Sequence, residues 1–417
     1  MKKILFTSIL LVGMASAQFD NVGTSAANFL KIGVGSRAAG MGGAYSAQVA
    51  DASALYWNPS GIAHITSPQV VFSSFNWIAD MKHSFLAVAI PTKSGTFGLS
   101  LIYFDMGDMT KTTELSPYGD EGTFSASDFA IGVGYGTKIS DRFAVGMQVK
   151  LIRETISFSS ASAFAVDAGT QYVTRFYGLR IGMAVTNFGT KMRLYGTDNK
   201  VDVDAYEDFG ANPDVIAHLN TDDWSIPMAF RFGLSMTPIG KNGFIKQDLT
   251  EVTVNCEYFD PRDYNPYYIL GVEAKVLDAF YIRSGMQFKF MQFSDDLSDE
   301  TDNSNFQDAL KSEDGVGYVQ NMSFGIGIDT EKISFVPVKM RIDYSSSDLG
   351  LLGLVERLTL SIFFKFYFNS CLKRPSVEGL FNFNSFLVKQ HKLCNFQYGF
   401  KSRNNPKTRC SGRKKCC

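Results

Sequence analysis

The residues that could do chemistry stand in no arrangement typical of an enzyme. The sequence has no Gly-x-Ser-x-Gly turn for a nucleophile and no phosphate-binding loop that ends in Gly-Lys-Ser/Thr. Gly33-Val-Gly35 matches part of a dinucleotide-binding turn, but it follows no long strand and lacks the third glycine. None of the four histidines belongs to a helical zinc-binding pattern; they are His64, His83, His218 and His391. The sequence therefore predicts no enzyme and no cofactor.

Charged side chains recur on the polar face of several segments in which apolar and polar residues alternate. The basic members are Arg180, Arg231, Arg283, Lys339 and Arg341, and the acidic members are Asp167, Glu251, Glu257, Glu273 and Asp343. Because an unpaired charge is costly in a confined interior, we expect these side chains to pair with one another and with the segment that fills the interior. A ligand path through that interior is the alternative interpretation.

Two acidic segments, 195–223 and 294–314, carry closely spaced oxygen donors. The second contains Ser294-Asp-Asp-Leu-Ser-Asp-Glu-Thr-Asp-Asn303, but it lacks the ordered spacing of a calcium-binding loop. We therefore expect solvated surface loops and no metal site.

The elements that position these side chains are predicted to be β-strands. Residues alternate with period two, as in Phe129, Ile131, Val133 and Tyr135, which are separated by alanine or glycine. We expect about fourteen strands, near 68–77, 83–91, 95–104, 124–138, 141–156, 160–174, 177–187, 225–237, 244–259, 264–276, 279–292, 317–329, 332–345 and 355–368.

The connections between these strands alternate between short and long. Ile139-Ser-Asp141 and Leu277-Asp278 are short, whereas 105–123, 188–224 and 293–316 are long. Bacterial outer-membrane barrels have this pattern, with short turns in the periplasm and long loops outside. The predicted fold is all-β, a ~14-stranded antiparallel transmembrane β-barrel with a periplasmic amino terminus. A secreted soluble β-protein has a similar composition and is the alternative.

The amino terminus has the pattern of an export signal. A basic start, Met1-Lys2-Lys3, precedes an apolar stretch over 4–14 and the small residues Ala15-Ser16-Ala17. We expect a signal peptide over 1–17, an N-terminal hatch or plug over 18–66, the barrel over 67–368 and an atypical basic, cysteine-rich tail over 369–417. Hydrophobic residues make up 45% of the chain, yet no apolar run reaches the ~18 residues of a membrane helix.

A Gly/Ala-rich stretch over 30–61 differs from the strands that follow it. Its glycines allow close backbone approach, and Asn58-Pro59-Ser60-Gly61 is typical of a turn, so we expect a plug that fits inside another part of the chain. Its motif residues are Arg37, Ala38, Gly40, Met41, Gly42, Gly43, Asp51, Ala52, Trp57, Asn58, Pro59, Ser60 and Gly61. This motif resembles the N-terminal segment of the PorV/PorQ family of outer-membrane proteins, which are relatives of the FadL-type barrels.

The resemblance covers roughly residues 26–368 and carries several expectations. It implies the outer membrane of a Gram-negative-type (diderm) bacterium, with a hatch in the barrel lumen. For PorV-like members it implies a cargo-binding shuttle or scaffold in type IX secretion, with secretion-system proteins and cargo as partners. For FadL-like members it implies a transporter of hydrophobic small molecules. Outer-membrane lipid or lipopolysaccharide is a further expected partner, and nucleic acid is not.

The end of the chain departs from the family pattern. Barrels of this type resemble one another in ending at an aromatic residue that the assembly machinery reads, and Phe368 fits that role. Basic and irregular sequence follows it, with Cys371, Cys394, Cys410, Cys416 and Cys417. Their number is odd and their spacing matches no zinc pattern. We expect this extension to lie outside the barrel.

Overall fold

The computed structural model describes residues 23–119, 122–203, 215–241, 243–288, 321–330 and 339–364. Four short helices come first: η1 (Asn28–Lys31), α2 (Ser36–Ala39), α3 (Ala54–Trp57) and η2 (Pro59–His64). Three later 3-10 turns are η3 (Ile78–Asp80), η4 (Thr197–Asn199) and η6 (Gly350–Leu352). The strands are β1 (Gln69–Asn76), β2 (Lys82–Pro91), β3 (Thr96–Thr110), β4 (Thr123–Ser140), β5 (Phe143–Ile156), β6 (Ser159–Val173), β7 (Arg180–Gly189), β8 (Tyr195–Gly196), β9 (Lys200–Val203), β10 (Val215–His218), β11 (Ala229–Ile239), β12 (Thr250–Pro261), β13 (Tyr267–Val276), β14 (Phe280–Phe288), β15 (Asn321–Asp329), β16 (Lys339–Asp348) and β17 (Leu354–Phe363).

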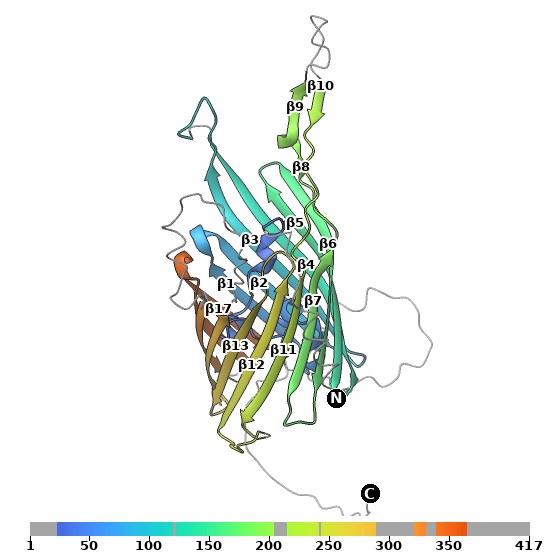
Figure 1. The fold of residues 1–417 in the computed structure, drawn as a ribbon, viewed down its shortest axis with the longest axis vertical. Helices are drawn as coiled ribbons and strands as arrows, with labels where there is room; N and C mark the ends of the chain where they lie inside the picture. The colour runs from blue at the N-terminus through green and yellow to red at the C-terminus, as the bar shows by residue number, and fades with distance from the viewer. Residues whose placement is uncertain are drawn as a thin grey trace, which may run out of the picture. The chain divides into compact units, whose positions relative to one another are not determined.

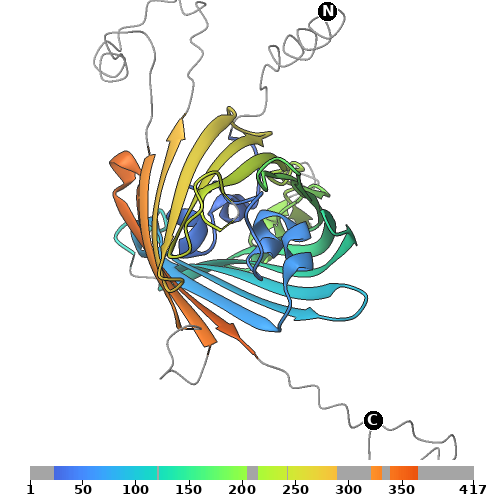
Figure 2. The same ribbon diagram turned by 90° about the horizontal axis from the view of Figure 1, so that it is seen from below.

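Fourteen of these strands form one closed antiparallel barrel. Each of β1 to β7 and β11 to β17 pairs with its neighbours along the chain, with β7 beside β11. The ring closes where β1 pairs with β17, in a register that sets Val70 opposite Ile362. Figure 2 shows the ring end-on, with the amino-terminal helices inside it. The predicted fourteen-stranded barrel is therefore confirmed.

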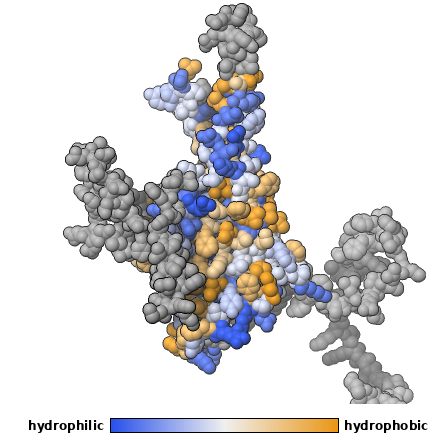
Figure 3. Space-filling model, turned by 45° about the vertical axis from the view of Figure 1, so that its right-hand side comes forward, coloured by the Kyte–Doolittle hydropathy of each residue, from blue (hydrophilic) through white to orange (hydrophobic). Residues whose placement is uncertain are grey.

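The two faces of the barrel wall differ as the period-two pattern predicts. Large apolar side chains such as Val133, Phe324 and Leu358 lie exposed on the outside. Such a continuous apolar exterior is what a lipid-facing wall needs. Figure 3 shows apolar side chains on the barrel wall, below the polar hairpin at the top of the view. Within the described ranges, no helix is long and apolar enough to cross a membrane.

One end of the barrel carries the long connections and the other carries short turns. The connection between β7 and β11 contains a separate two-stranded sheet, in which β9 pairs with β10 and Val201 lies opposite Ala217. This hairpin extends away from the long-loop end (Figure 1). The alternation of loop lengths predicted the connection, but its internal strands were missed because each has only four residues.

The strand bounds differ from the expected ones at a few ends. β12 begins at Thr250 rather than near 244. The preceding residues form a turn instead, in which Ile245 N donates to Pro238 O and Gly240 N donates to Ile245 O. β3 continues to Thr110, beyond its expected end. Part of the strand expected over 332–345 lies outside the described residues, as does Phe368.

The amino-terminal segment, here called the hatch (residues 23–66), fills the lumen along its length. At the long-loop end, Ala26 N donates to Ser225 O, and Ala27 N donates to a carboxylate oxygen of Glu154 at 2.8 Å. At the short-turn end, η2 packs against β4 and β5. The first described residues therefore lie at the long-loop end, which differs from the expected periplasmic start. The polar partners Ser225 and Glu154 become neighbours only when the barrel closes, so the sequence pattern held no sign of them.

Barrel closure between β1 and β17 requires nothing after Phe363, so a variant that ends at Phe368 should insert and fold. We expect an unboiled sample of this variant, taken from outer membranes, to migrate faster on a denaturing gel than a boiled one, as folded barrels do. The full-length chain is the control. Absence of the fast band in both forms, with the protein in the soluble fraction, would contradict the barrel.

Candidate functional site

A belt of glycines around the inside of the barrel receives the hatch. A methyl group at Gly182 would lie 2.6 Å from the Ala47 Cα, and one at Gly136 would lie 2.6 Å from the Ile62 side chain. The belt runs through β3, β4, β5, β6, β7, β11, β13, β14 and β15, and its members are Gly98, Gly134, Gly136, Gly146, Gly169, Gly182, Gly233, Gly271, Gly285 and Gly325. Any side chain at these positions would meet the hatch, and at Gly146, Gly182 and Gly285 the nearest hatch atoms belong to the backbone.

The glycines of the hatch motif serve the same close fit. Gly40 faces Gly325 of β15, and a methyl group on Gly40 would lie 3.0 Å from the Gly325 Cα. Gly42 and Gly43 have φ angles of 68° and 98°, a left-handed conformation that glycine adopts without strain. A methyl group on Gly61 would lie 2.6 Å from Val49 O, inside the hatch itself.

Six charged side chains join the hatch to the barrel in a closed ring, here called the ion ring. Arg37 binds Glu273 through two hydrogen bonds of 2.6 and 2.8 Å, and Glu273 accepts a third from Arg283 at 2.6 Å. Asp343 accepts hydrogen bonds from Arg283 at 2.7 Å and from Arg341 at 3.0 Å.

Asp51 of the hatch closes the ion ring. Arg341 donates to its carboxylate at 2.9 Å, and the Arg37 guanidinium lies 3.8 Å from the same oxygen. Tyr45 also donates to this oxygen at 2.8 Å, and Ser53 donates to the other oxygen. Three guanidinium groups thus alternate with three carboxylates, so the ring carries no net charge. Ion pairs this deeply buried are stable only when both partners are present.

Burial and the neighbouring arginines shift the pKa of Asp51 in opposite directions. Burial alone would raise the pKa of Asp51, but the positive charges of Arg341 and Arg37 more than offset it and hold the pKa below its ordinary value of 3.8. Asp51 is therefore a carboxylate at neutral pH, as its two cationic neighbours require.

A second carboxylate, Glu257 of β12, holds the hatch backbone. One of its oxygens accepts hydrogen bonds from Tyr45 N and Ser46 N, both at 2.9 Å. The other accepts one from Arg231 at 2.8 Å. The Arg231 guanidinium lies over the Trp57 ring, 4.7 Å from its centroid. Glu257 therefore satisfies two backbone donors and one cation at once.

The Asn58-Pro59 turn is fixed from both sides. Asn58 donates to Ser46 O at 2.9 Å and to Thr170 O of β6 at 3.1 Å, and its side-chain oxygen accepts a hydrogen bond from the Ser60 hydroxyl at 2.7 Å. Pro59 lies against Gly146 of β5. The turn is therefore held both to the rest of the hatch and to the barrel wall.

A cavity of about 430 Å³ lies between the hatch and the loops of the long-loop end. Its lining is largely aromatic and aliphatic, with Phe29, Ile32, Trp57, Trp77, Phe104 and Ile269. Arg357 of β17 lies at this cavity with 5% of its surface exposed and donates to Ser347 at 3.0 Å. Its Nε has no hydrogen-bond partner, and in the described part of the chain Arg357 forms no ion pair.

His83 is buried beside this cavity, among aromatic side chains and the Arg357 guanidinium. Its ring stacks on Phe75 at a centroid distance of 4.9 Å, and the Arg357 guanidinium lies over the other part of this cluster, 4.6 Å from the Phe75 centroid. Neither ring nitrogen of His83 has a hydrogen-bond partner among the described residues. His83 and Arg357 were not predicted among the lumen charges. Both lie in the lumen near the long-loop end.

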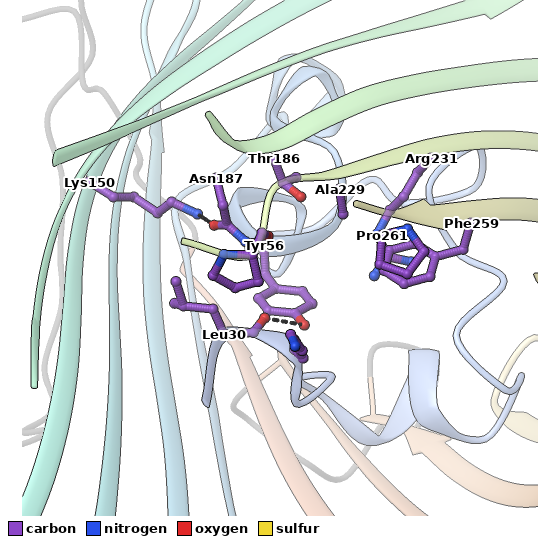
Figure 4. Close-up of a pocket in the computed structure, with 11 residues that line it drawn as sticks. Leu30, Tyr56, Lys150, Thr186, Asn187, Ala229, Arg231, Phe259 and Pro261 are labelled. Carbon is purple, nitrogen blue, oxygen red and sulfur yellow. Dashed lines mark hydrogen bonds between the residues drawn. The ribbon is translucent and has the colours of Figure 1, made fainter. Parts of the chain in front are cut away.

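A smaller recess of about 30 Å³ lies behind Tyr56 (Figure 4). Lys150 of β5 reaches the Asn187 side chain there and also pairs with Asp167 at 2.8 Å. The Tyr56 hydroxyl donates to Leu30 O at 3.0 Å. These contacts occupy most of the recess, and the remaining space is large enough for a water-sized group.

The structure brings most of the expected charges together. Arg283, Arg341 and Asp343 lie in the ion ring, and Arg231 pairs with Glu257. Glu273 is also a ring member, and Asp167 pairs with Lys150. The two remaining basic residues lie toward the short-turn end: Arg180 faces a polar recess of about 190 Å³ that Glu251 also lines, and Lys339 begins β16. Sequence reasoning missed Arg37 as the partner of Glu273 and missed the whole glycine belt. The regular inward placement of glycine along alternating strands was the signal that could have indicated the belt.

Comparison with known proteins gives one family match. The model of the family described as "Type IX secretion system protein PorV" matches residues 15–222, half of this chain. No curated protein matches it.

Solved structures with a similar arrangement include two toluene transporters. TodX of Pseudomonas putida is 11% identical, with a TM-score of 0.46 over 79% of this chain and 96% of TodX. TbuX of Ralstonia pickettii is 12% identical, with a TM-score of 0.44 over 79% of this chain and 97% of TbuX. The outer membrane protein Omp33 of Acinetobacter baumannii is 8% identical, with a TM-score of 0.32 over 72% and 98%.

The glycine belt predicts a sharp difference between neighbouring positions of β7. The Gly182→Val substitution should displace the hatch, because the new side chain would overlap the Ala47 backbone, and should lower the unfolding free energy by about 1–3 kcal/mol. Met183→Val, one residue on and exposed on the outer face, should change it little. Urea unfolding in detergent measures both, and equal effects would contradict the belt.

The ion ring predicts that loss of one member leaves each of its two neighbours with one opposite charge instead of two. Glu273→Gln should lower the unfolding free energy by about 3–5 kcal/mol, because Arg37 and Arg283 each lose one of two carboxylate partners and the buried ring gains a net positive charge. Lys275→Met, which removes the more exposed pair with Asp278, should cost about 1 kcal/mol or less. The double variant Arg37→Met with Glu273→Gln should cost less than the sum of the two single changes if pairing is the cause.

The lowered pKa of Asp51 predicts how hatch docking depends on pH. A carboxyl whose pKa is lower in the folded state stabilises the fold fully above its unfolded pKa, and this contribution is lost as the pH falls through the folded pKa. Unfolding midpoints should therefore be insensitive to Asp51 between pH 7 and about pH 5 and should fall below about pH 4. Asp51→Asn should flatten that acid limb, whereas Asp108→Asn, at an exposed position, should not.

Proposed function

Because the chain belongs to the PorV family of type IX secretion system proteins, we propose that it is a cargo-binding shuttle or scaffold of type IX secretion. It is a barrel of the outer membrane of a diderm bacterium, and its family is one of secretion-system proteins. The long-loop end then faces the cell exterior and the short-turn end faces the periplasm. Secretion-system proteins and exported cargo are its proposed partners.

The observation that carries this proposal is the fixed hatch. The ion ring, Glu257 and Asn58 attach the hatch to β6, β12, β13 and β16, so releasing it would separate two buried charge pairs and several hydrogen bonds at once. Breaking a single buried pair costs about 3–5 kcal/mol. A barrel whose plug is held in this way suits a binding platform better than a channel that must open.

The outer end supplies the surfaces that a partner would meet. Residues 195–223 include eight acidic residues and one lysine, and the described part of this segment projects as the β9–β10 hairpin (Figure 1). Ile216 and Leu219 are exposed on it. The 430 Å³ cavity at the foot of this end is closed below by Trp57, Gly42 and Gly43 of the hatch. An acidic hairpin and an aromatic recess at the same end of the barrel suit a polypeptide partner with basic and apolar residues.

The second candidate function is a FadL-like transporter of hydrophobic small molecules. The same aromatic cavity favours it, since a site of this volume and lining suits a small apolar ligand. Transport across the barrel would then require the hatch to move. Asn58 and Pro59, the motif turn, do not line the cavity, and they are packed against the wall instead.

Loss of the acidic hairpin tests the secretion role. Deleting 195–223 should remove type IX cargo from the culture medium and cell surface while the barrel still inserts, because this segment lies outside the fourteen-stranded ring. A milder variant, Asp222→Asn with Asp223→Asn, should reduce secretion in the same direction. If secretion is unchanged in both variants and toluene uptake is lost, the transporter function is favoured over the secretion function.

A disulfide between hatch and wall separates the two functions directly. Ser36 of α2 and Thr359 of β17 have hydroxyl oxygens 2.9 Å apart, so the pair Ser36→Cys and Thr359→Cys can lock the hatch. Cargo secretion should be the same in the oxidised and reduced forms, with each single-cysteine variant as control. A transporter should instead lose uptake in the oxidised form and regain it on reduction.

A further inference from the structure

The ladder between β7 and the segment that leads into β11 is interrupted near the outer rim. The last regular pair sets Thr186 opposite Ala229, and the next backbone pair above it joins Met192 to Trp224. Between them the two chains separate: Gly189 pairs with β6 instead, and Ser225 O accepts the hydrogen bond from Ala26 N.

Asn187 is where β7 leaves the ladder. It has a φ of 59°, its backbone N donates to Asp167 of β6 at 2.7 Å, and its side chain donates to Pro227 O at 3.0 Å. This side chain therefore links β7 across the gap to the segment that leads into β11. The gap itself is a groove of about 460 Å³, lined by residues 187–189, 191, 223–228, 262 and 263 and by Thr24; we call it the rim groove.

The length of β7 places the rim groove at the edge of the membrane. Its ten residues, tilted by about 40° at about 3.3 Å per residue, span about 25 Å, the height of the apolar band of an outer-membrane barrel. The outward side chains of this strand are apolar: Met183, Val185 and, at the groove, Phe188, which is 65% exposed. The groove therefore begins where the lipid-facing wall ends, at the level of the outer-leaflet headgroups.

The charges of the rim groove leave two cations open. Its acids are already neutralised, since Asp223 pairs with Arg193 at 2.8 Å and Asp263 pairs with Lys31 of the hatch. Lys191 and Arg262 are both exposed, and within the described ranges neither forms an ion pair, although the carboxylate of Asp260, two residues before Arg262, interacts with its charge at longer range. Trp224 lines the same groove and is partly exposed, as aromatic side chains at a membrane boundary are.

We propose that the rim groove binds the phosphate-bearing headgroup of an outer-leaflet glycolipid, that is, lipopolysaccharide. Lys191 and Arg262 contact the phosphate oxygens, for which ammonium and guanidinium groups are suited. Phe188 contacts the first part of the acyl region, and Trp224 covers the headgroup. The site is separate from the 430 Å³ cavity and does not depend on the secretion role.

The test measures lipid retention by the purified full-length protein. After delipidation in mild detergent, the protein is mixed with bisphosphorylated lipid A or with its dephosphorylated form, and bound lipid is counted by native mass spectrometry. The wild type should retain the phosphorylated probe preferentially. Lys191→Gln with Arg262→Gln should weaken binding by about fivefold for each cation removed, the order expected for a basic side chain at an anionic membrane surface.

The controls separate this site from general attraction and from misfolding. Lys241→Gln with Lys246→Gln removes two exposed cations at the periplasmic end and should leave retention unchanged. The conservative pair Lys191→Arg with Arg262→Lys keeps both charges and should retain the lipid, and heat-modifiable mobility verifies that each variant is folded. Equal retention of both probes by the wild type, or equal retention of lipid A by the wild type and the glutamine variant, would overturn the proposal. Cargo secretion is measured separately, so either result leaves the secretion role to its own test.

Discussion

Space inside the barrel is the constraint on which the rest of the structure depends. A lumen closed by fourteen strands cannot hold a folded segment if every inward position of its wall carries a large side chain. The chain resolves this by placing glycine wherever the hatch lies closest, so that Gly182 meets the backbone at Ala47 and Gly325 meets Gly40. With backbone so near backbone, small displacements of the hatch cause overlap with the wall. The hatch therefore has one position, and the side chains that surround it can form specific contacts.

The ion ring follows from that single position. Arginine and carboxylate side chains buried in the lumen need partners at hydrogen-bond distance, and a plug free to shift would leave them unpaired. Arg37 and Asp51 come from the hatch, and their partners Glu273 and Arg341 come from the wall. Alternation of three cations and three anions lets each group contact two of opposite charge. The ion pairs that balance the buried charges therefore also attach the hatch to the wall.

The two ends of the barrel consequently differ in what they offer. At the short-turn end the recess below the ion ring is small and polar. At the long-loop end there are a larger aromatic cavity, an acidic hairpin and the rim groove. The β7–β11 ladder is also interrupted at this end. Asn187 leaves the ladder, and Ala26 of the hatch donates a hydrogen bond to Ser225 in the segment that leads into β11. The hatch thus shapes the outer rim as well as closing the lumen.

Local chemistry determined much of this protein in advance. Period-two alternation, short and long connections in turn, and the hatch motif predicted a barrel of about fourteen strands with a plug, because a strand between lipid and lumen must alternate at every step. Pairing among Arg231, Glu257, Arg283 and Asp343 was expected for the same reason, since charge facing a lumen must be neutralised. Only the tertiary structure decided which partners meet: Arg37 with Glu273, Asp51 with Arg341, and Ala26 with Ser225 lie far apart in the chain. Their distances depend on barrel closure and on the depth of the hatch, and a one-dimensional pattern specifies faces of strands but neither of these.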